Sequence, residues 1–239
     1  MTSGTILSVN VSRAREVLRR GKPDRTAIFK VPVEGRVNLR GHQLEGDEQA
    51  DPTVHGGPAK AVYAYAREDT AWWEEQLGRP LVPGTFGENL TLSGVDIGAA
   101  RVGERWRAGN TVVEVTQPRS PCWKLAMRMG DPNFARTFRA AQRSGTYLAV
   151  VEEGDLGAGD PVERLSRPGH PITIGILAYL YEHDLRLASL AMEAATMPLE
   201  RIAWLELLRG GEIPEEHWSH WADGDDGEHP AAEQAARGS

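Results

Sequence analysis

Short β-favouring segments, each bounded by Gly, Pro or another turn-forming residue, fill the first two-thirds of this 239-residue chain. Segments of this kind, rich in Val, Ile, Thr or aromatic residues, are typical of strands; they span 5–11, 26–31, 35–44, 59–65, 101–108, 111–116 and 146–151. Gly109-Asn110 separates two of them and predicts a two-residue hairpin turn. Helical patterns interrupt this texture only near 67–77 and 133–142. Many short strands with few helices predict a mainly β (α+β) fold, a β-barrel or curled sheet with peripheral helices.

The pattern changes after residue 168, where strand signals stop. Helical periodicity follows in quick succession over 174–181, 185–195 and 199–208, and the short gaps between these segments predict a compact three-helix module. The end of the chain is rich in Asp, Glu, Ala and Gly without periodicity, which is typical of a disordered tail. We therefore expect a β-barrel domain over 1–168, a three-helix C-terminal module over 171–211 and an acidic tail over 222–239.

The charge of the chain is divided unevenly along the sequence. Residues 1–170 hold 23 Lys and Arg against 21 Asp and Glu, whereas residues 171–239 hold 4 against 13. The first part can therefore form a local anion-binding groove, while the second would repel phosphate. Without a concentrated stripe of Lys and Arg along the sequence, we expect no nucleic-acid partner.

Apolar runs in this chain are too short for a transmembrane helix, which needs about 18 or more such residues. The first ten residues lack the long apolar region of a secretory signal. One cysteine in 239 residues is compatible with a reducing compartment. We therefore expect a cytoplasmic protein with no membrane partner.

Cys122 is the only cysteine of the chain, which excludes an intramolecular disulfide and a zinc site built on two or more cysteines. A lone thiol is either a small buried hydrophobe or a single thiolate that binds metal or attacks a substrate. Arg119 and Lys124 flank it, and positive charge favours the thiolate form. A Cys-His hydrolase with His55 stays open, although no nucleophile elbow supports it.

Two other segments carry convergent polar groups. The first spans 46–60 and combines carboxylates, His55 and Lys60 with Gly56-Gly57, a pair that lets backbone amides approach a ligand. The second, 84–90, places Glu88 and Asn89 in a tight glycine-bounded loop. The motifs of zinc proteases, phosphate loops and dinucleotide-binding turns are absent from the sequence.

Three segments, in this order and spacing, resemble the MOSC domain, named for the C-terminal domain of molybdenum-cofactor sulfurases. They are the stretch 47–65 with His55-Gly56-Gly57 and Lys60, the loop 84–90, and Gln117-Pro118-Arg119-Ser120-Pro121-Cys122. The resemblance is to the YiiM-type subfamily, which adds a C-terminal three-helix module, and it covers about residues 5 to 210. It implies a MOSC-type β-barrel that holds a molybdenum cofactor, the molybdopterin form, with Cys122 as the protein ligand of the metal. One soft thiolate beside the two dithiolene sulfurs suits molybdenum.

For a cofactor of this kind, side-chain chemistry indicates further roles. They are Lys60 and Arg119 as anchors for phosphate or pterin oxygens, Asn89 and Gln117 as readers of the pterin edge, Gly56 and Gly57 as the close-approach pair, and His55 or Asp51 as proton relay.

The resemblance implies reduction of N-hydroxylated compounds, including N-hydroxylated purine bases, to amines, a detoxifying reaction in which oxygen is removed at molybdenum. Flavin, haem and iron–sulfur patterns are absent from the sequence, so a separate electron-donating reductase is implied. A non-catalytic carrier or sensor of molybdopterin or sulfur, acting through Cys122, is the alternative from another class. A barrel used only for protein interaction is a third. The three-helix module could cover the cleft, dock the reductase or form a homodimer.

Overall fold

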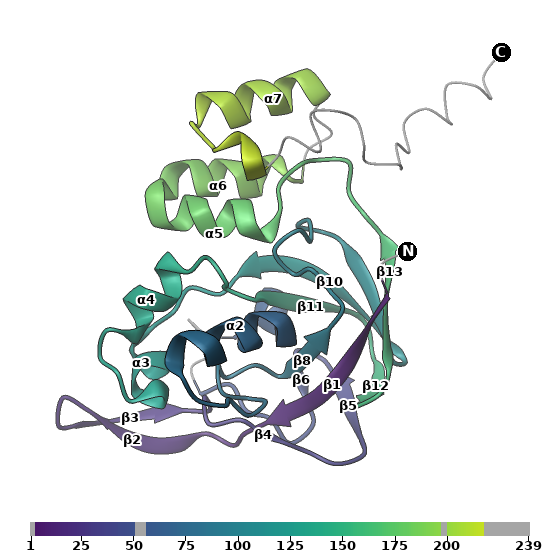
Figure 1. The fold of residues 1–239 in the computed structure, drawn as a ribbon. Coiled ribbons are helices and arrows are strands. Elements are labelled where there is room, and N and C mark those ends of the chain that lie inside the picture. Colours follow the sequence, from purple (N-terminus) through teal and green to yellow (C-terminus); the bar gives the residue numbers. More distant parts are fainter. Residues whose placement is uncertain (1–2, 51–55, 197–199, 218–239) are drawn as a thin grey trace.

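The computed structural model describes residues 3–50, 56–196 and 200–217 (Figure 1). Its barrel strands are β1 (Ser3–Val11), β7 (Val62–Ala66), β8 (Leu90–Ser93), β9 (Arg105–Ala108), β10 (Thr111–Pro118), β11 (Thr146–Glu152) and β13 (Pro161–Ser166). They pair in the order β13-β9-β10-β11-β7-β8-β1, and β1 pairs again with β13. Only the β7–β8 pair is parallel among these. The seven strands therefore close into a barrel, which confirms the predicted mainly β fold with peripheral helices.

Apolar side chains on the inner faces of these strands fill the barrel, as the alternation of a pleated strand requires. Ile6, Val113 and Leu148 are fully buried there. Trp106 joins them, and its Nε1 donates to Glu104 Oε1 at 2.8 Å, so the one polar atom of the indole is satisfied. Gly109-Asn110 forms the predicted turn, since Ala108 of β9 pairs with Thr111 of β10.

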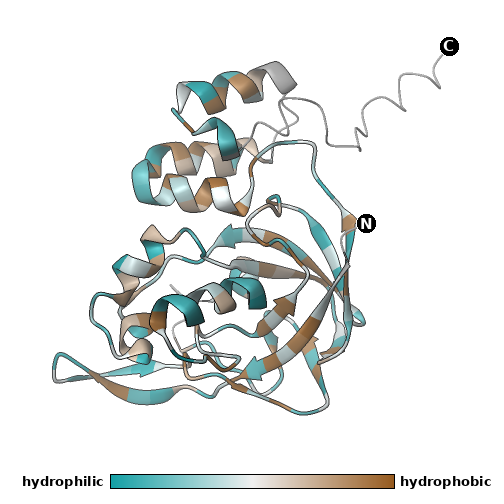
Figure 2. Ribbon diagram, in the orientation of Figure 1, coloured by the Kyte–Doolittle hydropathy of each residue, from teal (hydrophilic) through white to brown (hydrophobic). Residues whose placement is uncertain are grey.

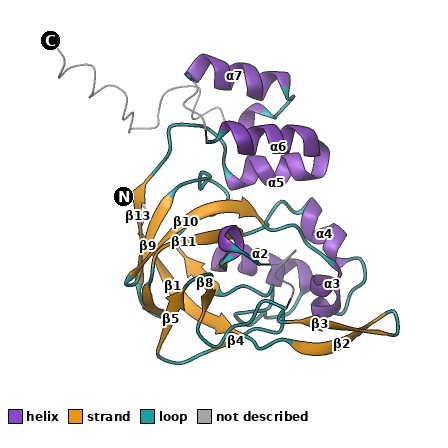
Figure 3. Ribbon diagram, turned by 180° about the vertical axis from the view of Figure 1, so that it is seen from behind, coloured by secondary structure: helices purple, strands orange, loops and turns teal. Residues whose placement is uncertain are grey.

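Smaller strand groups surround the barrel. β5 (Arg36–Arg40), β6 (Gln43–Leu44) and β12 (Gly154–Gly157) form a three-stranded sheet, and β4 (Val31–Pro32) pairs with the end of β1. β2 (Arg15–Arg19) and β3 (Lys22–Thr26) form a hairpin that pairs with no other described strand. Figures 1 and 3 show this hairpin projecting beyond the barrel.

The predicted strand over 26–31 is wrong for most of its length. Thr26 ends β3, and its Oγ1 accepts a hydrogen bond from the Ile28 backbone N at 3.2 Å, which turns the chain away from the hairpin. The predicted strand over 35–44 is two strands, because a turn with Gly41 at φ 57° separates β5 from β6. The strand expected from residue 59 starts only at Val62, since Pro58–Lys60 form a short 3-10 helix, η1.

Helices α2 (Arg67–Leu77), α3 (Trp123–Met129) and α4 (Phe134–Ala140) lie against the barrel. The bounds of α2 match the prediction, and Gly78 ends the helix at φ 62°. The sequence does not predict α3, which has only seven residues. An aromatic cluster joins these helices to β7: the rings of Trp73 and Phe138 stack at 5.7 Å, and Trp73 Nε1 donates to the Tyr65 hydroxyl at 2.9 Å.

The C-terminal helices are α5 (Ile174–His183), α6 (Leu185–Ala194) and α7 (Arg201–Gly210), followed by a 3-10 turn, η2 (Glu215–His217). Thr173 and Asp184 cap the first two with side-chain oxygens, and Asp184 accepts from two backbone N–H groups. Brown and teal patches alternate along α5 and α6 in Figure 2, as expected for amphipathic helices. Their apolar faces form a core of their own around Trp204. The tail expected over 222–239 lies outside the described residues.

A membrane-crossing helix is not found in the described part of the chain, where every helix is too short or too polar to serve as one.

His170 connects the barrel to the helices. It lies between β13 and α5, is 6% exposed, and its ring centre is 5.6 Å from that of Trp204 on α7. Its Nδ1 accepts a hydrogen bond from the Ile172 backbone N at 3.2 Å. Burial, with a smaller contribution from the charge of Arg101, lowers the pKa of His170 to about 4. The folded protein therefore keeps this imidazole neutral.

We expect the stability of the protein to fall as the pH drops from about 6.5 towards 4, because the unfolded chain then binds a proton at His170 that the folded chain excludes. The full effect of this one group is on the order of 3 kcal/mol. Asn can still accept the Ile172 hydrogen bond but does not titrate, so His170→Asn should flatten this loss in urea unfolding. The exposed His42→Asn is the control and should keep the wild-type slope. An unchanged slope in His170→Asn would contradict this account.

Candidate functional site

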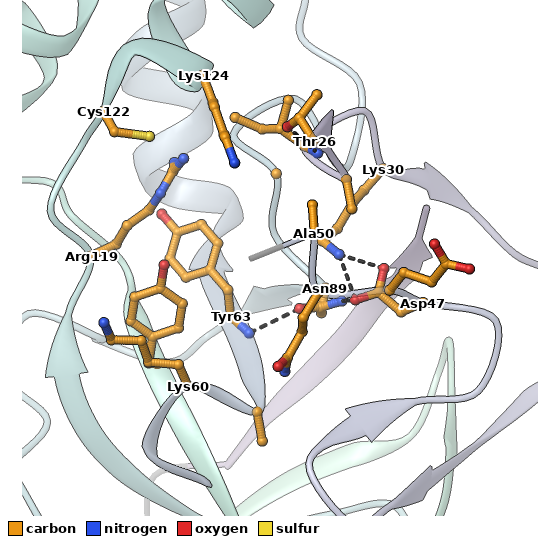
Figure 4. Close-up of a pocket in the computed structure, with 17 residues that line it drawn as sticks. Thr26, Lys30, Asp47, Ala50, Lys60, Tyr63, Asn89, Arg119, Cys122 and Lys124 are labelled. Atoms are coloured by element: carbon orange, nitrogen blue, oxygen red, sulfur yellow. Dashed lines mark hydrogen bonds and ion pairs between the residues drawn. The ribbon is translucent and has the colours of Figure 1, made fainter. Parts of the chain in front are cut away.

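A cavity beside the barrel gathers several of the predicted site residues (Figure 4). Its empty volume is about 650 Å³, part of it open to solvent. Residues from separated segments line it: the stretch after β3, residues 47–50, the start of β7, the 84–89 loop, and the segment joining β10 to α3. Cys122, Lys60, Asn89 and Arg119 all contribute to the lining.

The loop over 84–89 forms one wall and is organised by a carboxylate of its own. Glu88 is 1% exposed and accepts hydrogen bonds from the Gly84 backbone N at 2.6 Å, the Phe86 backbone N at 3.0 Å and the Thr91 hydroxyl at 3.0 Å. Burial raises the pKa of Glu88, although these three donors oppose the shift. The carboxylate thus occupies the inside of the turn rather than the cavity.

Glycines let this loop press against the segment that follows β3. Gly84 and Gly87 have φ values of 82° and 78°, where a side chain is strained. A Cβ on Gly84 would lie 2.5 Å from the Lys30 carbonyl oxygen, and one on Gly87 would lie 2.8 Å from Ile28 Cγ1. Close packing therefore requires both glycines and sets the shape of this wall.

Arg119 joins the loop to the far side of the cavity. Its side chain donates from Nη1 to the Phe86 carbonyl at 2.6 Å, and its guanidinium carbon lies 5.1 Å from the Tyr63 ring centre. Burial by itself would lower its pKa, but the neighbouring Tyr63, Tyr147 and Cys122 groups outweigh it and raise the pKa of Arg119. Burial raises the pKa of Tyr147 despite this guanidinium. Arg119 therefore holds a fixed positive charge in the cavity wall beside a neutral phenol.

An ion pair of Lys30 and Asp47 closes the opposite side. Lys30 Nζ lies 2.5 Å and 2.6 Å from the two carboxylate oxygens, and both side chains are less than a tenth exposed. Asp47 also accepts from the Ser12 backbone N at 2.8 Å and from Asn89 Nδ2 at 2.9 Å. Burial lowers the pKa of Lys30, and Asp47 counteracts that shift. The two charges compensate each other, so this side contributes little net charge.

Asn89 is bonded mainly within the protein. Its Oδ1 accepts from the Tyr63 backbone N at 3.1 Å, and its Nδ2 donates to Asp47 and to the Asn10 carbonyl at 3.2 Å. These bonds join β1, β7 and β8 at the cavity. The structure gives Asn89 a positioning role for Asp47, and its predicted contact with a pterin stays a prediction.

Cys122 directly precedes α3 and is partly exposed at the cavity. Figure 4 shows its side chain on the same side as those of Arg119 and Lys124, across from the Lys30–Asp47 pair. Lys124 is 8% exposed, and Lys60 Nζ lies 6.0 Å from the Tyr147 ring centre. The thiol therefore shares one half of the cavity with several cationic side chains.

The remaining predicted site residues either lie outside the cavity lining or belong to the part of the chain that the structure does not describe. Gln117 is in β10, outside the lining, and its carbonyl accepts from the Thr146 hydroxyl at 3.3 Å. Gly56 and Gly57 are also outside the lining, and the Gly57 backbone N donates to Gln49 Oε1 at 3.3 Å. Asp51 and His55 lie outside the described residues.

The sequence singles out Lys124 as a cation beside the thiol, but it does not point to Lys30, Tyr63 or Tyr147. Each of these three stands in a segment that was predicted to be a strand. A usable signal existed for Lys30, a single charge inside the apolar stretch 27–31. Such a charge is buried only when it is paired.

We expect the Lys30–Asp47 pair to be strongly coupled. Lys30→Met leaves a buried carboxylate with fewer donors and should lower the free energy of unfolding by about 3 kcal/mol. In the double variant Lys30→Met/Asp47→Asn the uncompensated charge is gone, so the loss should be about 1–2 kcal/mol smaller than the sum of the single losses. Urea unfolding of the four proteins in this cycle measures the coupling. Strictly additive losses would show that the pair does not act as a unit.

Known proteins share this architecture. Residues 51–163 match the family described as MOSC domain. The uncharacterized protein YflK of Bacillus subtilis (strain 168) is 38% identical over 180 residues, which cover 75% of this chain and 81% of YflK. A protein named Reductase from Gibberella moniliformis is 31% identical over 172 residues, 69% of this chain but only 30% of that protein.

The crystal structure of YiiM from Geobacillus stearothermophilus superposes with a TM-score of 0.65 at 29% identity, covering 87% of this chain and 98% of that one. The superposition thus extends beyond the matched residues 51–163 to most of the chain. The chain belongs to the MOSC domain family, and its fold is that of the YiiM proteins.

Proposed function

We propose that this chain binds a molybdenum cofactor in the cavity through Cys122 and reduces N-hydroxylated compounds to amines, with electrons from a separate reductase. The observation that carries the proposal is the meeting of the only thiol of the chain with Arg119 and Lys124 in one half of the cavity. Similarity to a fungal protein named Reductase and to YiiM supports it.

The side chains present fit such a cofactor. A pterin with a dithiolene and a phosphate is anionic, and charge-assisted hydrogen bonds from Arg and Lys are the strong interactions for its oxygens. Arg119, Lys60 and Lys124 line the cavity, while the charge of Lys30 is already neutralised by Asp47. A soft thiolate is the protein ligand that suits a metal with sulfur donors, and Cys122 supplies one.

Each residue then has a defined task. Arg119 is held by the Phe86 carbonyl, so its position is set before any ligand arrives, which lowers the cost of ordering it. Tyr63 donates its hydroxyl to the Ser144 carbonyl at 2.8 Å, and burial raises its pKa, so it stays a neutral wall. Asp47 of the ion pair accepts a hydrogen bond from Asn89 Nδ2 and so helps to fix the Asn89 side chain.

When bound, the cofactor supplies a metal that changes its oxidation state by two electrons. Conversion of a hydroxylamine to an amine and water consumes two electrons and two protons. Proton delivery is the role we propose for His55 or Asp51, residues of the 46–60 segment.

Cys122→Ala should abolish molybdenum retention and reductase activity. The free energy of unfolding should stay within about 1 kcal/mol of wild type, because the side chain is small and only partly buried. The test is metal analysis of protein purified from cofactor-producing cells, together with turnover of a panel of N-hydroxylated bases. Wild-type protein without molybdenum would refute the proposal. Cofactor that passes readily to an apo-enzyme, without turnover, would favour the carrier function.

Lys124→Gln should weaken cofactor retention about tenfold, the loss expected for one charge-assisted hydrogen bond. Molybdenum per protein after dialysis measures this retention, and Arg107→Gln on the exposed outer surface of β9 is the matched control. Equal retention by Lys124→Gln and the control would remove Lys124 from the anchoring set.

A further inference from the structure

The β2–β3 hairpin concentrates positive charge on a chain whose net charge is −7. The segment 13–25, which we call the basic arm, holds six Lys and Arg against two acidic residues. All six cationic residues are exposed, and none forms an ion pair with a residue in the described part of the chain. The sequence reading missed this concentration because it did not recognise the hairpin that brings the charges together.

The tip of the basic arm carries charge at positions where folding does not favour it. Arg19 and Lys22 stand directly opposite each other across the two strands, and like charges in this arrangement destabilise a strand pair. Arg20 and Gly21 form the turn, with φ values of 52° and 77°. Asn, Asp or Gly is favoured at the first of these positions. The like-charge pair, and an Arg at a turn position that favours Asn, Asp or Gly, indicate that these tip cations serve a role other than stabilising the hairpin.

Protection of an open strand edge is the simpler explanation for charged residues on a hairpin. It accounts for a Lys or Arg on each edge strand. It does not account for cations placed opposite each other, nor for Arg20 in the turn, where Asn would serve the fold better.

The base of the basic arm is part of the cavity. Thr26, the last residue of β3, lines it. The Arg19 guanidinium carbon lies 5.0 Å from the ring centre of Trp123, the residue next to Cys122. Arg15 lies 3.4 Å from the ring centre of Phe29, and Arg128 of α3 lies 5.2 Å from the same centre. Positive charge therefore continues from the tip of the arm to the helix that begins at the cavity.

The opposite end of the molecule has the opposite charge. The described residues 171–196 and 200–217 hold three Arg against eight acidic residues, and their helices lie far from the basic arm in Figure 1. An acidic partner would be repelled there and attracted to the arm. Complementary charge of this kind raises association rates and fixes orientation.

We propose that the basic arm docks an acidic electron-transfer protein, of which a flavodoxin is the type, so that the reduced flavin bound in that protein faces the Trp123 side of the cavity. This inference rests on the proposed reductase function. The two electrons come from two docking events in succession, in each of which one bound flavin hydroquinone is oxidised to the semiquinone. The surface beside the cavity, rather than the three-helix module, is then the reductase-docking surface.

The test compares two triple variants in the full chain loaded with cofactor. Arg19→Glu/Arg20→Asp/Lys22→Glu reverses the charge of the tip and keeps a like-charge pair across the two strands, so the cross-strand repulsion is matched. Arg79→Glu/Arg107→Glu/Arg186→Glu changes net charge equally at exposed residues outside the arm. With reduced flavodoxin as donor, the tip variant should raise the KM for flavodoxin about tenfold at low ionic strength. Turnover driven by reduced methyl viologen should be unchanged, and the control variant should stay near wild type.

The outcomes separate the two proposals. An unchanged KM for flavodoxin in the tip variant, or an equal rise in the control, overturns the docking inference. Duplex DNA that binds the wild type more tightly than flavodoxin does, and loses this binding in the tip variant, overturns it in favour of a nucleic-acid surface. Absence of turnover even with methyl viologen defeats the reductase proposal. Calorimetry then tests the docking inference without activity: flavodoxin should bind the wild type more tightly than the tip variant, and equal binding overturns the inference.

Discussion

The buried carboxylate of Asp47 is the interaction on which the candidate site most depends. It accepts from Lys30, from the Ser12 backbone and from Asn89, and thereby joins segments that lie far apart in the sequence. A buried charge is tolerated only when such partners surround it. The position of the cavity wall, the neutralisation of Lys30 and the orientation of Asn89 all follow from this one group. Its partners are therefore structural conditions for the site.

Glu88 and Arg119 extend the same principle to the other side of the cavity. Glu88 satisfies two backbone donors of its own loop, and Arg119 satisfies the Phe86 carbonyl of that loop. A loop with buried backbone groups needs such partners. Because Arg119 performs this task from the segment that ends in Cys122, the loop wall and the thiol are held relative to each other. The cavity is thus preorganised by residues that belong to the fold.

Sequence reasoning predicted the parts of this structure that depend on local patterns. The limits of α2, the Gly109-Asn110 turn and the three C-terminal helices follow from capping residues, turn chemistry and periodicity. It failed where a side chain redirects the backbone, as Thr26 does at the end of β3, and where a helix is as short as α3. Gln117 shows the same limit at the site: two residues before Arg119 in sequence, it stays in β10 outside the cavity lining. Adjacency in a motif does not fix which side chains reach a cavity.

The net charge of a long stretch of sequence does not show how its charged residues are arranged in the folded molecule. A balanced first part contains both a compensated pair, Lys30–Asp47, and an arm whose six cations have no ion-paired partner among the described residues. Because Asp47 neutralises Lys30, Arg119 and Lys124 provide positive charge on the half of the cavity that contains the thiol. The basic arm continues this field outward through Arg19 and Trp123. An anion approaching this face is therefore drawn first to the arm and then to Arg119 and Lys124 beside the thiol, whereas the acidic helical end repels it. That ordering of charge, set by strand register and burial, gives the molecule one face suited to anionic ligands.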